Sequence, residues 1–374
     1  MGFVYPQQSN VNLDWAPHKN IRNLVPYMAS INSPEVDDNR MITFRVNAPD
    51  VKEVMLGGTI LTQLRKENPV PFKKDSVGNW LLKVGPLPRD IYFYNFIIDG
   101  LKTIDPNNTY TGFANQPGFS IVVVHGGGPS FYDAKNVPHG NIIRHIYHSD
   151  VLNGEREMYV YTPPMYDEGK EYPVLYLLGG SGELASSWTF MGKINFIADN
   201  LIAENKAKPM IIVMPNNQVV HRRAEDHLEK NFDLLEKELR HHIIPIIEST
   251  YSVSTSRHNR AIAGLSMGGR QAQVTGFNCI DLFASFGLLS SAAPLNSNPI
   301  FFKDPEINSK IDFLFLGAGA FETDETSRHK LLHDQLTELN IKHEYYIGGN
   351  GGHDFITWRH LMYYHFLPAL WKIK

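Results

Sequence analysis

The sequence predicts an α/β protein in which a small all-β domain precedes a larger domain, built on a mostly parallel sheet with helices on both faces. From Met41 to about Val124 every apolar segment has the pattern of a strand, and clusters of Gly, Pro, Asp and Asn separate these segments. Beyond about residue 140 the pattern changes, because apolar strands alternate with stretches that repeat at helical spacing. The length of 374 residues is sufficient for two such domains.

The first domain is expected over residues 31–125, after an N-terminal extension of residues 1–30. Its strands are predicted in the segments ITFRVNAP, VKEVMLGG, NWLLKVGPL, IYFYNFIIDG and FSIVVV. Short strands at this spacing favour an immunoglobulin-like β-sandwich. In the fourth segment, Tyr92, Tyr94 and Phe96 occupy alternate positions and therefore share one face. That face could be an aromatic platform for a glycan, but two buried faces and a supporting role are the favoured interpretation.

A linker is expected at residues 126–140, where glycines and prolines are frequent. The second domain is expected over residues 141–374. Its strands are predicted at residues 173–180, 209–215, 260–266, 283–290 and 311–317. Two helices are predicted from apolar residues at helical spacing, which are Ile194, Ile197, Ala198, Leu201 and Ile202 in one and Leu235, Leu239, Ile243 and Ile247 in the other. This alternation predicts a mostly parallel sheet with both faces covered.

The composition excludes several classes of function. A formal net charge of −4 and an isoelectric point near 6.5 provide no basic field for nucleic acid or an anionic membrane. No apolar run approaches the roughly 20 residues that span a bilayer, and the first residues lack the charged and apolar regions of a signal peptide. The single cysteine, Cys279, excludes an intrachain disulfide and a cysteine-rich metal site, and it is expected to be a small buried residue.

The stretch Gly264-Leu-Ser266-Met-Gly268 has the spacing G-x-S-x-G. In this motif a serine lies on a sharp turn between a strand and a helix, and its small neighbours let the backbone fold tightly around an exposed hydroxyl. A predicted strand ends just before the motif, and the residues after it are compatible with a helix. Ser266 is therefore the candidate nucleophile, with a glycine-rich turn as the alternative.

A serine nucleophile needs a base within hydrogen-bonding reach, and His353 is the candidate. It lies in GGNGGHDF, a glycine-rich loop after the strand-like segment KHEYYI, where it can approach other loops without steric cost. The alternative is a loop histidine that caps the next helix. Four other histidines fall in predicted helices and are expected at the surface or in packing, namely His241, His242, His329 and His333.

The base in turn needs a carboxylate that holds its tautomer, and three candidates follow the predicted strand that ends near Gly317. They are Glu322, Asp324 and Glu325. Glu322 is favoured because it lies on the loop immediately beyond the strand. Asp324 is the alternative, although its neighbours have the pattern of a helix entry, where an acidic residue can cap the helix or interact with its dipole.

Two backbone N–H groups should stabilise the oxyanion of a tetrahedral intermediate. One belongs to the residue after the nucleophile, here Met267, and the other to the loop after an early strand. The segment Leu178-Gly-Gly-Ser-Gly-Glu183 directly follows the strand VLYL, so Gly180 and Ser181 are the candidates. The alternative is a plain turn at the exit of that strand.

Together with these residues, four ordered stretches resemble the esterase D-like branch of the α/β-hydrolases. They are YVYTPPMYDEGKEYPVLYLLGGSGELASSW, NLIAENKAKPMIIVMPN, IIPIIESTYSVSTSRHNRAIAGLSMGG and GGHDFITWR, and they cover most of residues 155–374. Within this branch the chain is most similar to bacterial feruloyl esterases with an N-terminal module like that of glycogen-branching enzymes, and it is more distantly similar to enterochelin esterases. The segments TFRVNAPDVKEVMLGG and DSVGNWLLKVGPLPRDIYFYNFIIDG resemble that module.

The resemblance implies an α/β-hydrolase fold and a triad of Ser266, His353 and either Glu322 or Asp324. Glu322 falls at the position of the aspartate in the family's strand-end Gly-x-x-Asp pattern. One departure is that Gly179-Gly180 replaces the usual His-Gly. Because this segment contributes backbone N–H groups, the change should reshape the loop without removing the donor, and it bears on the substrate preference.

The implied function is hydrolysis of hydroxycinnamoyl esters, such as ferulate esters, on plant cell-wall xylan, through an acyl-serine intermediate and without a metal or cofactor. The alternatives are an acetyl-xylan esterase, a siderophore-lactone esterase and a non-catalytic carbohydrate-binding protein. Feruloylated arabinoxylan or its oligosaccharides are the expected partners. The resemblance implies a secreted or periplasmic bacterial protein, with a cytoplasmic location left open.

Two further features have alternative interpretations. Trp188 and Trp358 flank the motifs and could contact an aromatic acid, or they could belong to the core. The polar insert at residues 218–227 is either a lid over the pocket or, as slightly favoured, a solvated connection before the next helix.

Overall fold

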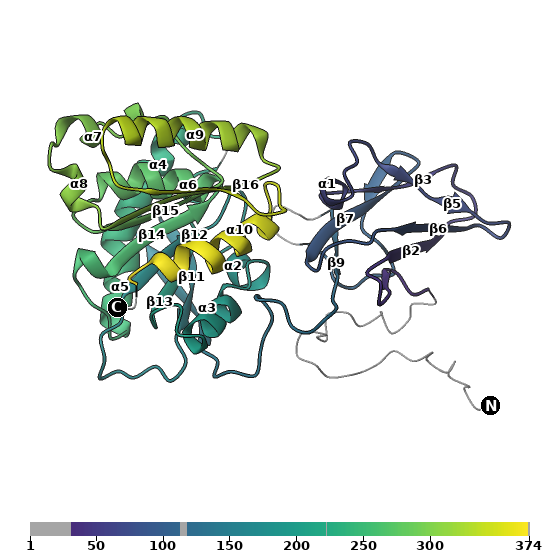
Figure 1. Ribbon diagram of the computed structural model, residues 1–374, viewed down its shortest axis with the longest axis horizontal. Coiled ribbons are helices and arrows are strands. Elements are labelled where there is room, and N and C mark those ends of the chain that lie inside the picture. The colour runs from purple at the N-terminus through teal and green to yellow at the C-terminus, as the bar shows by residue number, and fades with distance from the viewer. Residues whose placement is uncertain (1–30, 113–117, 222, 373–374) are drawn as a thin grey trace.

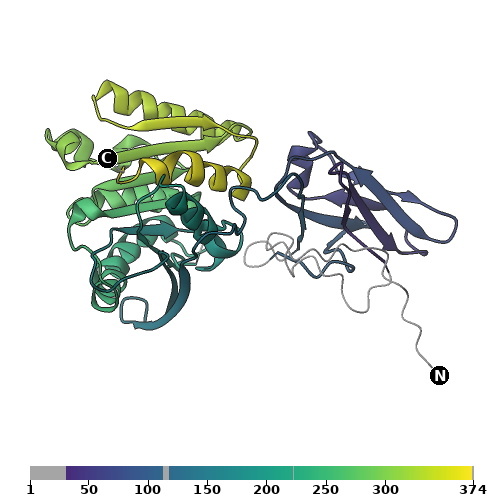
Figure 2. The same ribbon diagram turned by 60° about the horizontal axis from the view of Figure 1, so that its bottom comes forward.

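The computed structural model describes residues 31–112, 118–221 and 223–372, which form two units (Figure 1). The N-terminal unit is built from β-strands, and the C-terminal unit combines a large sheet with helices. A segment without strands or helices joins the two, as Figure 2 shows from a second direction. Within the described residues, none of the helices has both the length and the apolar character needed to cross a membrane.

The N-terminal unit contains two antiparallel sheets that share one hydrophobic core. One sheet has the strand order β1-β2-β6-β5, and the other has the order β4-β3-β7-β8 with β9 paired to β7. The elements are β1 (Glu35–Val36), β2 (Ile42–Asn47), β3 (Val54–Gly57), α1 (Ile60–Gln63), β4 (Val70–Pro71), β5 (Lys73–Lys74), β6 (Asn79–Val84), β7 (Ile91–Ile98), β8 (Leu101–Thr103) and β9 (Ser120–Val123). The five predicted strands are confirmed as β2, β3, β6, β7 and β9, whereas the others are too short to have a recognisable pattern.

Strand β7 has buried residues on both of its faces. Tyr92, Tyr94 and Phe96 are at most 2% exposed and pack in the core between the two sheets. Ile91 and Phe93 point to the opposite face and join a hydrophobic cluster of the C-terminal unit. The favoured interpretation of two buried faces is confirmed, and an aromatic platform formed by Tyr92, Tyr94 and Phe96 is excluded.

The C-terminal unit contains an eight-stranded sheet with the order β10-β11-β13-β12-β14-β15-β16-β17. The first two strands are antiparallel to their neighbours, and the remaining six are parallel to one another. The strands are β10 (Asn141–Ser149), β11 (Gly154–Thr162), β12 (Val174–Leu178), β13 (Ile211–Pro215), β14 (Arg260–Leu265), β15 (Ser285–Leu289), β16 (Phe313–Gly319) and β17 (Glu344–Gly348). The five strands predicted for this domain are confirmed, and the β10-β11 hairpin is an addition at the edge of the sheet.

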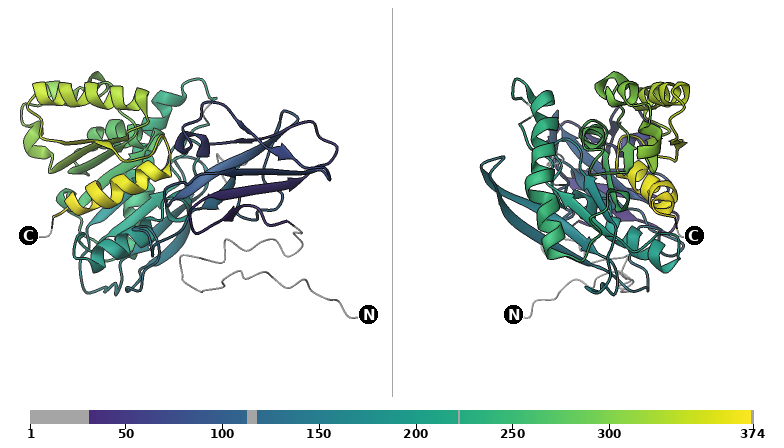
Figure 3. Two further views of the ribbon diagram at one scale, coloured as in Figure 1. Left: turned by 45° about the vertical axis from the view of Figure 1, so that its right-hand side comes forward. Right: turned by 90° about the vertical axis from the view of Figure 1, so that its left-hand side faces the viewer.

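Helices cover both faces of this sheet, as the side view in Figure 3 shows. One face carries α4 (His227–Glu238), η3 (Leu239–Ile243), α5 (Ile244–Thr250), α6 (Met267–Asn278), α7 (Ile300–Lys303), α8 (Ile307–Lys310) and α9 (Thr323–Glu338). The other carries α2 (Ser187–Phe190), α3 (Ile194–Ala203), α10 (Phe355–Leu361), η6 (Met362–Phe366) and α11 (Leu367–Ala369). Short turns precede β14 and α7, namely η4 (Arg257–Asn259) and η5 (Leu295–Ser297). The central strands are continuous apolar runs because both of their faces are covered.

Strand β12 is the point at which the strand order of the sheet changes direction. The chain moves from β12 to β13 on one side, and it later returns to β14 on the other side. In parallel sheets of this kind, ligands bind outside the carboxyl ends of the strands at such a switch point. The loops after β12 and β14 carry Gly180 and Ser266, so the topology places the predicted oxyanion loop beside the predicted nucleophile.

Residues 126–140, the expected linker, form neither a strand nor a helix, and they are attached to the C-terminal unit by side chains of α3. The Asn200 amide donates a 2.9 Å hydrogen bond to the backbone oxygen of Phe131. The Asp199 carboxylate, which is 1% exposed, accepts a 2.9 Å hydrogen bond from the Gly140 N–H. The connection between the units is therefore anchored at its middle and at its end.

Candidate active site

Ser266 lies between β14 and α6 in a backbone conformation that is rare for residues other than glycine. Its φ is 52° and its ψ is −121°. The backbone N–H of Ser266 donates a 2.9 Å hydrogen bond to the backbone oxygen of Leu289. The backbone oxygen of Ser266 accepts a 3.1 Å hydrogen bond from the backbone N–H of Arg270. The G-x-S-x-G stretch therefore forms a strained turn from strand to helix, with Ser266 at the surface of a cavity.

The glycines of this turn are required because backbone segments pass one another at close range. A Cβ atom on Gly264 would lie 2.4 Å from the carbonyl carbon of Gly268. A Cβ atom on Gly268 would lie 2.4 Å from the backbone oxygen of Gly179. Contacts this short do not occur between real Cβ atoms and backbone, so the nucleophile turn packs directly on the loop after β12 only with glycine at these positions.

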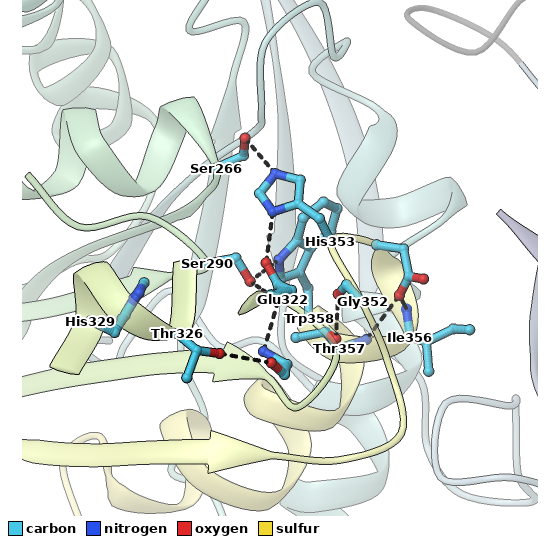
Figure 4. Close-up of polar contacts among 12 residues, drawn as sticks. Ser266, Ser290, Glu322, Thr326, His329, Gly352, His353, Ile356, Thr357 and Trp358 are labelled. Atoms are coloured by element: carbon cyan, nitrogen blue, oxygen red, sulfur yellow. Dashed lines mark hydrogen bonds and ion pairs between the residues drawn. The ribbon is translucent and has the colours of Figure 1, made fainter. Parts of the chain in front are cut away.

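Ser266, His353 and Glu322 form a continuous chain of hydrogen bonds (Figure 4). The Ser266 Oγ is 2.9 Å from His353 Nε2, and His353 Nδ1 is 2.7 Å from Glu322 Oε2. A carboxylate can only accept, so the Nδ1–H of His353 donates to Glu322 and the Nε2 lone pair faces the serine hydroxyl. The three residues come from the loops after β14, β17 and β16, which the parallel sheet brings to one edge.

Glu322 is buried, at 5% exposure, and its second oxygen is held by two further donors. The Oε1 atom accepts hydrogen bonds from the Ser290 hydroxyl and the Gly319 N–H, each at 2.7 Å. The Ser290 hydroxyl accepts in turn from the Trp358 indole N–H at 2.8 Å. This network satisfies the buried carboxylate and fixes the oxygen that faces His353.

The other two acidic candidates lie at the start of α9. Asp324 is exposed in the first turn of that helix, and Glu325 follows it in sequence. Glu322 is the carboxylate that meets His353, and its part in a catalytic triad stays a prediction. The place of Asp324 agrees with its alternative role as a partner of the helix dipole.

The loop after β12 approaches Ser266 closely. A Cβ atom on Gly180 would lie 3.4 Å from the Ser266 Cβ and 2.7 Å from Leu265 Cδ1. Met267 is the first residue of α6, where N–H groups have no acceptor within the helix. Gly180, Ser181 and Met267 are thus placed around the nucleophile as the sequence predicts, although their role as donors to an oxyanion stays a prediction.

Two side chains outside the predicted site hold this loop in place. The Asn217 side chain accepts from the Gly179 N–H at 3.0 Å and donates to the Gly179 oxygen at 2.7 Å. The Gln218 side chain accepts from the Gly182 N–H at 2.9 Å and donates to the Gly180 oxygen at 2.8 Å. Both residues directly follow β13, and polar residues immediately after a buried parallel strand are the sequence signal that identifies them.

Residue Gln218 also begins the insert at residues 218–227. The described residues of this insert are 218–221 and 223–227, and none of them is among those that line the cavity. The contacts of Gln218 make the start of the insert a brace for the loop after β12.

Ser266 and His353 line a cavity that opens to solvent. Its polar wall includes Ser181, Glu183 and Ser187, and its apolar wall includes Met191, Leu265, Phe355 and Trp358. Two more lining residues, Thr59 and Phe93, come from the N-terminal unit. Thr59 and Phe93 are far from Ser266 and His353 in the sequence and belong to no motif, so the sequence did not predict their place in the site.

The two tryptophans differ in position. Trp358 lines the cavity and packs edge-to-face on the His353 ring, with ring centroids 5.3 Å apart. Trp188 is 1% exposed, donates its indole N–H to the Leu178 oxygen at 2.9 Å, and packs edge-to-face on Phe355. The structure therefore places Trp188 in the core, which was the alternative to contact with an aromatic acid. It places Trp358 in the cavity wall.

Asp354, next to His353, is the N-cap of α10 and also lines the cavity. Its carboxylate accepts from the N–H groups of Ile356 and Thr357, at 3.0 and 3.3 Å. Burial raises the pKa of Asp354 to about 6, and the nearby Asp90 adds to this shift while Arg359 opposes it. Among the described residues, no group of three or more His, Cys, Asp or Glu side chains could hold a metal ion.

The sheet, its helices and the positions of the loops define an α/β-hydrolase. Residues 149–367, more than half of the chain, match the model of an esterase family with the description "Putative esterase". The chain belongs to this esterase family.

Two curated relatives are proteins of xylan degradation. An endo-1,4-beta-xylanase/feruloyl esterase from Xylanibacter ruminicola is 31% identical over 340 residues, which cover 87% of this chain and 44% of the relative. Endo-1,4-beta-xylanase Y from Acetivibrio thermocellus is 30% identical over 162 residues, which cover 40% of this chain and 14% of the relative. The chain thus spans less than half the length of these relatives.

Solved structures of two kinds of esterase resemble this chain. A ferulic acid esterase from the anaerobic fungus Anaeromyces mucronatus has 27% identity and a TM-score of 0.56, and the match covers 65% of this chain and 96% of that one. An enterobactin esterase from Shigella flexneri has 16% identity and a TM-score of 0.66, with coverages of 88% and 93%, and this likeness shows the fold alone. The family resemblance inferred from the sequence is confirmed.

Proposed function

We propose that this chain is a serine carboxylesterase that hydrolyses hydroxycinnamoyl esters, such as ferulate esters, on plant xylan. The observation that carries this proposal is the hydrogen-bonded chain from Ser266 through His353 to Glu322 at the wall of an open cavity. A serine, a neutral imidazole and a buried carboxylate in this order are the groups that acyl transfer requires.

In the first half-reaction, the Ser266 Oγ attacks the ester carbonyl carbon while His353 Nε2 takes its proton. The carbonyl electron pair moves onto oxygen, where the N–H groups of Met267 and of Gly180 or Ser181 stabilise the negative charge. Glu322 stabilises the imidazolium that forms. When the intermediate collapses, the bond between the carbonyl carbon and the sugar oxygen breaks, and His353 gives the proton to that oxygen, which leaves as a sugar hydroxyl.

In the second half-reaction, water replaces the sugar. His353 takes a proton from the water as its oxygen attacks the acyl carbon, and the bond to Ser266 Oγ then breaks as the proton passes to the serine. The products are a carboxylic acid and the regenerated Ser266 hydroxyl, so water is the co-reactant that the hydrolysis consumes.

The substrate class is supported by the relatives and by the cavity. The curated relative that matches 87% of this chain is named as both a xylanase and a feruloyl esterase, and a ferulic acid esterase structure shares 27% identity. Phe93, Phe355 and Trp358 supply flat apolar surfaces near the nucleophile, on which an aromatic acid could pack. A secreted or periplasmic location fits an enzyme that acts on xylan or on its oligosaccharides.

The proposal also includes domain boundaries. We assign an immunoglobulin-like sandwich to residues 31–125, a connection to residues 126–140 and the esterase domain to residues 141–374. The two antiparallel sheets with one shared core support the first assignment. Residues 1–30 lie outside the described residues.

Acetyl-xylan esterase and siderophore-lactone esterase are the alternatives. Because the fold resembles that of an enterobactin esterase over 88% of this chain, a siderophore lactone belongs among the substrates to be tested. A purely carbohydrate-binding role is opposed by the intact hydrogen-bonded chain of three residues.

The test is turnover of methyl ferulate, para-nitrophenyl acetate and a catechol siderophore lactone by the purified protein. We expect methyl ferulate to be hydrolysed, and Ser266→Ala to reduce turnover by about 10⁴- to 10⁶-fold. Ser309→Ala is the matched control, because this serine is exposed on α8. Mass spectrometry of quenched reactions should find the acyl group on the peptide that contains Ser266.

Two results would contradict the proposal. Hydrolysis of the siderophore lactone without that of methyl ferulate would replace the substrate class. A Ser266→Ala variant that kept a tenth of wild-type turnover would remove Ser266 from the mechanism.

A further inference from the structure

The cavity at Ser266 is closed on one side by the N-terminal unit. Thr59 and Phe93 line it together with Ser266 and His353. Figure 1 shows α1 and β7 at the side of the N-terminal unit that faces the C-terminal unit. If the N-terminal unit served only to attach the esterase to another molecule, its side chains would not be needed in the wall of this cavity.

Phe93 is part of the contact between the units. It lies on the face of β7 that points away from the core of its own unit, and it is 7% exposed. Its ring packs edge-to-face on Phe119, with centroids 6.2 Å apart. The ring therefore presents a supported apolar surface to the cavity.

Thr59 and Phe93 form one continuous patch. The backbone before Thr59 lies directly on β7, since a Cβ atom on Gly58 would lie 2.7 Å from Tyr94 Cα and 2.9 Å from the Phe93 oxygen. The Thr59 hydroxyl is 3.5 Å from the same Phe93 oxygen. The two residues thus keep their relative positions.

Buried polar contacts hold this patch against the C-terminal unit. Asp90, which precedes β7, forms an ion pair with Arg359 of α10, whose side chain is fully buried. Arg359 also donates a 2.6 Å hydrogen bond to the oxygen of Met191, another lining residue. The Gln63 side chain of α1 donates to the Asn350 oxygen, on the loop that leads to His353. The patch is therefore fixed relative to the catalytic loop.

We propose that Phe93 and Thr59 are specificity-determining residues that contact the acyl group of the ester, so that the N-terminal unit completes the active site. This proposal rests on the proposed function. A xylan chain is a long polymer, so its sugar should stay at the mouth of the cavity while the acyl group occupies the interior. The planar ring of a hydroxycinnamoyl group packs well on aromatic walls, whereas an acetyl group ends close to Ser266.

The comparison with a ferulic acid esterase is consistent with an added wall. That structure is matched over 96% of its own length by 65% of this chain, so about a third of this chain lies outside the match. The hydrolase fold of that esterase is complete without the remainder.

Two variants change the size of the patch in opposite directions. Phe93→Ala removes the aromatic surface, and Thr59→Phe fills the space beside it. The backbone of Thr59 has φ −67° and ψ −16°, which suits phenylalanine, and its side chain is half-buried, so this second variant should fold. Phe302→Ala is the matched control, because Phe302 is 60% exposed on α7 and does not line the cavity.

The measurement is kcat/KM for methyl ferulate and for para-nitrophenyl acetate, with thermal unfolding as the check of folding. Both variants should lower kcat/KM for methyl ferulate by about 10- to 100-fold and change that for the acetate by no more than roughly twofold. Phe302→Ala should change neither.

The outcomes separate this proposal from the proposed function. If the wild-type protein hydrolyses methyl ferulate but both variants keep the wild-type ratio of the two substrates, the patch does not contact the acyl group. Equal losses on both substrates would instead mean that the patch acts through the catalytic residues, which also overturns the proposal. A wild-type protein without activity on methyl ferulate would overturn the proposed function and this inference with it.

Discussion

Replacing Glu322 by glutamine tests how the carboxylate controls His353. In the native site, Oε1 accepts from Ser290 and from the Gly319 N–H, and Oε2 accepts from His353. An amide offers one oxygen acceptor and one nitrogen donor. The Gly319 N–H can only donate, so the amide oxygen should take the Oε1 position and turn its nitrogen toward His353.

This orientation would reverse the tautomer of His353. Its Nδ1 would have to accept, and the ring proton would move to Nε2, where it points at the Ser266 Oγ. A base that already carries a proton there cannot take another from the serine. The corresponding carboxylate-to-amide change in serine proteases lowers kcat by about 10⁴-fold, so we expect a loss of about 10³- to 10⁴-fold for Glu322→Gln, equivalent to about 4–5.5 kcal/mol in the barrier.

The assay is kcat for methyl ferulate and for para-nitrophenyl acetate, with Asp324→Asn as the control. Asp324 is exposed on α9, so its amide variant should stay within roughly twofold of wild type. Both substrates should be affected alike by Glu322→Gln, because the tautomer acts on the serine and not on the acyl group. Retention of a tenth of the wild-type kcat, or a severe loss in Asp324→Asn instead, would refute the reasoning.

Three further predictions concern stability. A Gly268→Ala change would place a methyl group 2.4 Å from the Gly179 oxygen, and it should lower the free energy of unfolding by about 1–3 kcal/mol and displace the loop after β12, which urea denaturation and turnover would show. Arg359→Met leaves the buried Asp90 without its counter-charge, and it should lower the free energy of unfolding by about 3–5 kcal/mol. Adding Asp90→Asn should recover part of this loss in thermal unfolding. A double variant without any recovery would count against the ion pair. Burial raises the pKa of Asp354 from 3.8 to about 6, so the folded state binds this proton more tightly than the unfolded state, and stability from this group falls as the pH rises through that interval. Relative to wild type, Asp354→Asn should therefore gain about 2 kcal/mol between pH 4 and pH 7, and a constant difference across urea denaturations at these pH values would contradict the shift.

Local patterns in the sequence predicted the architecture and two members of the candidate site. Strands such as β12 and β14 are continuous apolar runs, and the change from strand-only to alternating segments near residue 140 separates the units. The turn at Ser266 was predictable because its glycines are required by contacts within a few residues and with one neighbouring loop. His353 was predictable because a glycine-rich loop after a strand lets a ring reach its neighbours.

The choice among similar residues depended on the tertiary structure. Glu322 and Asp324 are two residues apart, and only the path of the loop after β16 decides which carboxylate reaches His353. Trp188 and Trp358 both flank the motifs, but Trp188 is buried in the core and Trp358 lines the cavity.

The wall formed by Thr59 and Phe93 is a property of the assembled molecule. Periodicity and turn chemistry act over a few residues, so the sequence by itself determined the elements, their order and the nucleophile turn. The packing of β7 on the C-terminal unit joins residues that are far apart along the chain, and no local pattern encodes which faces will meet. Only the folded chain therefore decided that the N-terminal unit shares the cavity of Ser266.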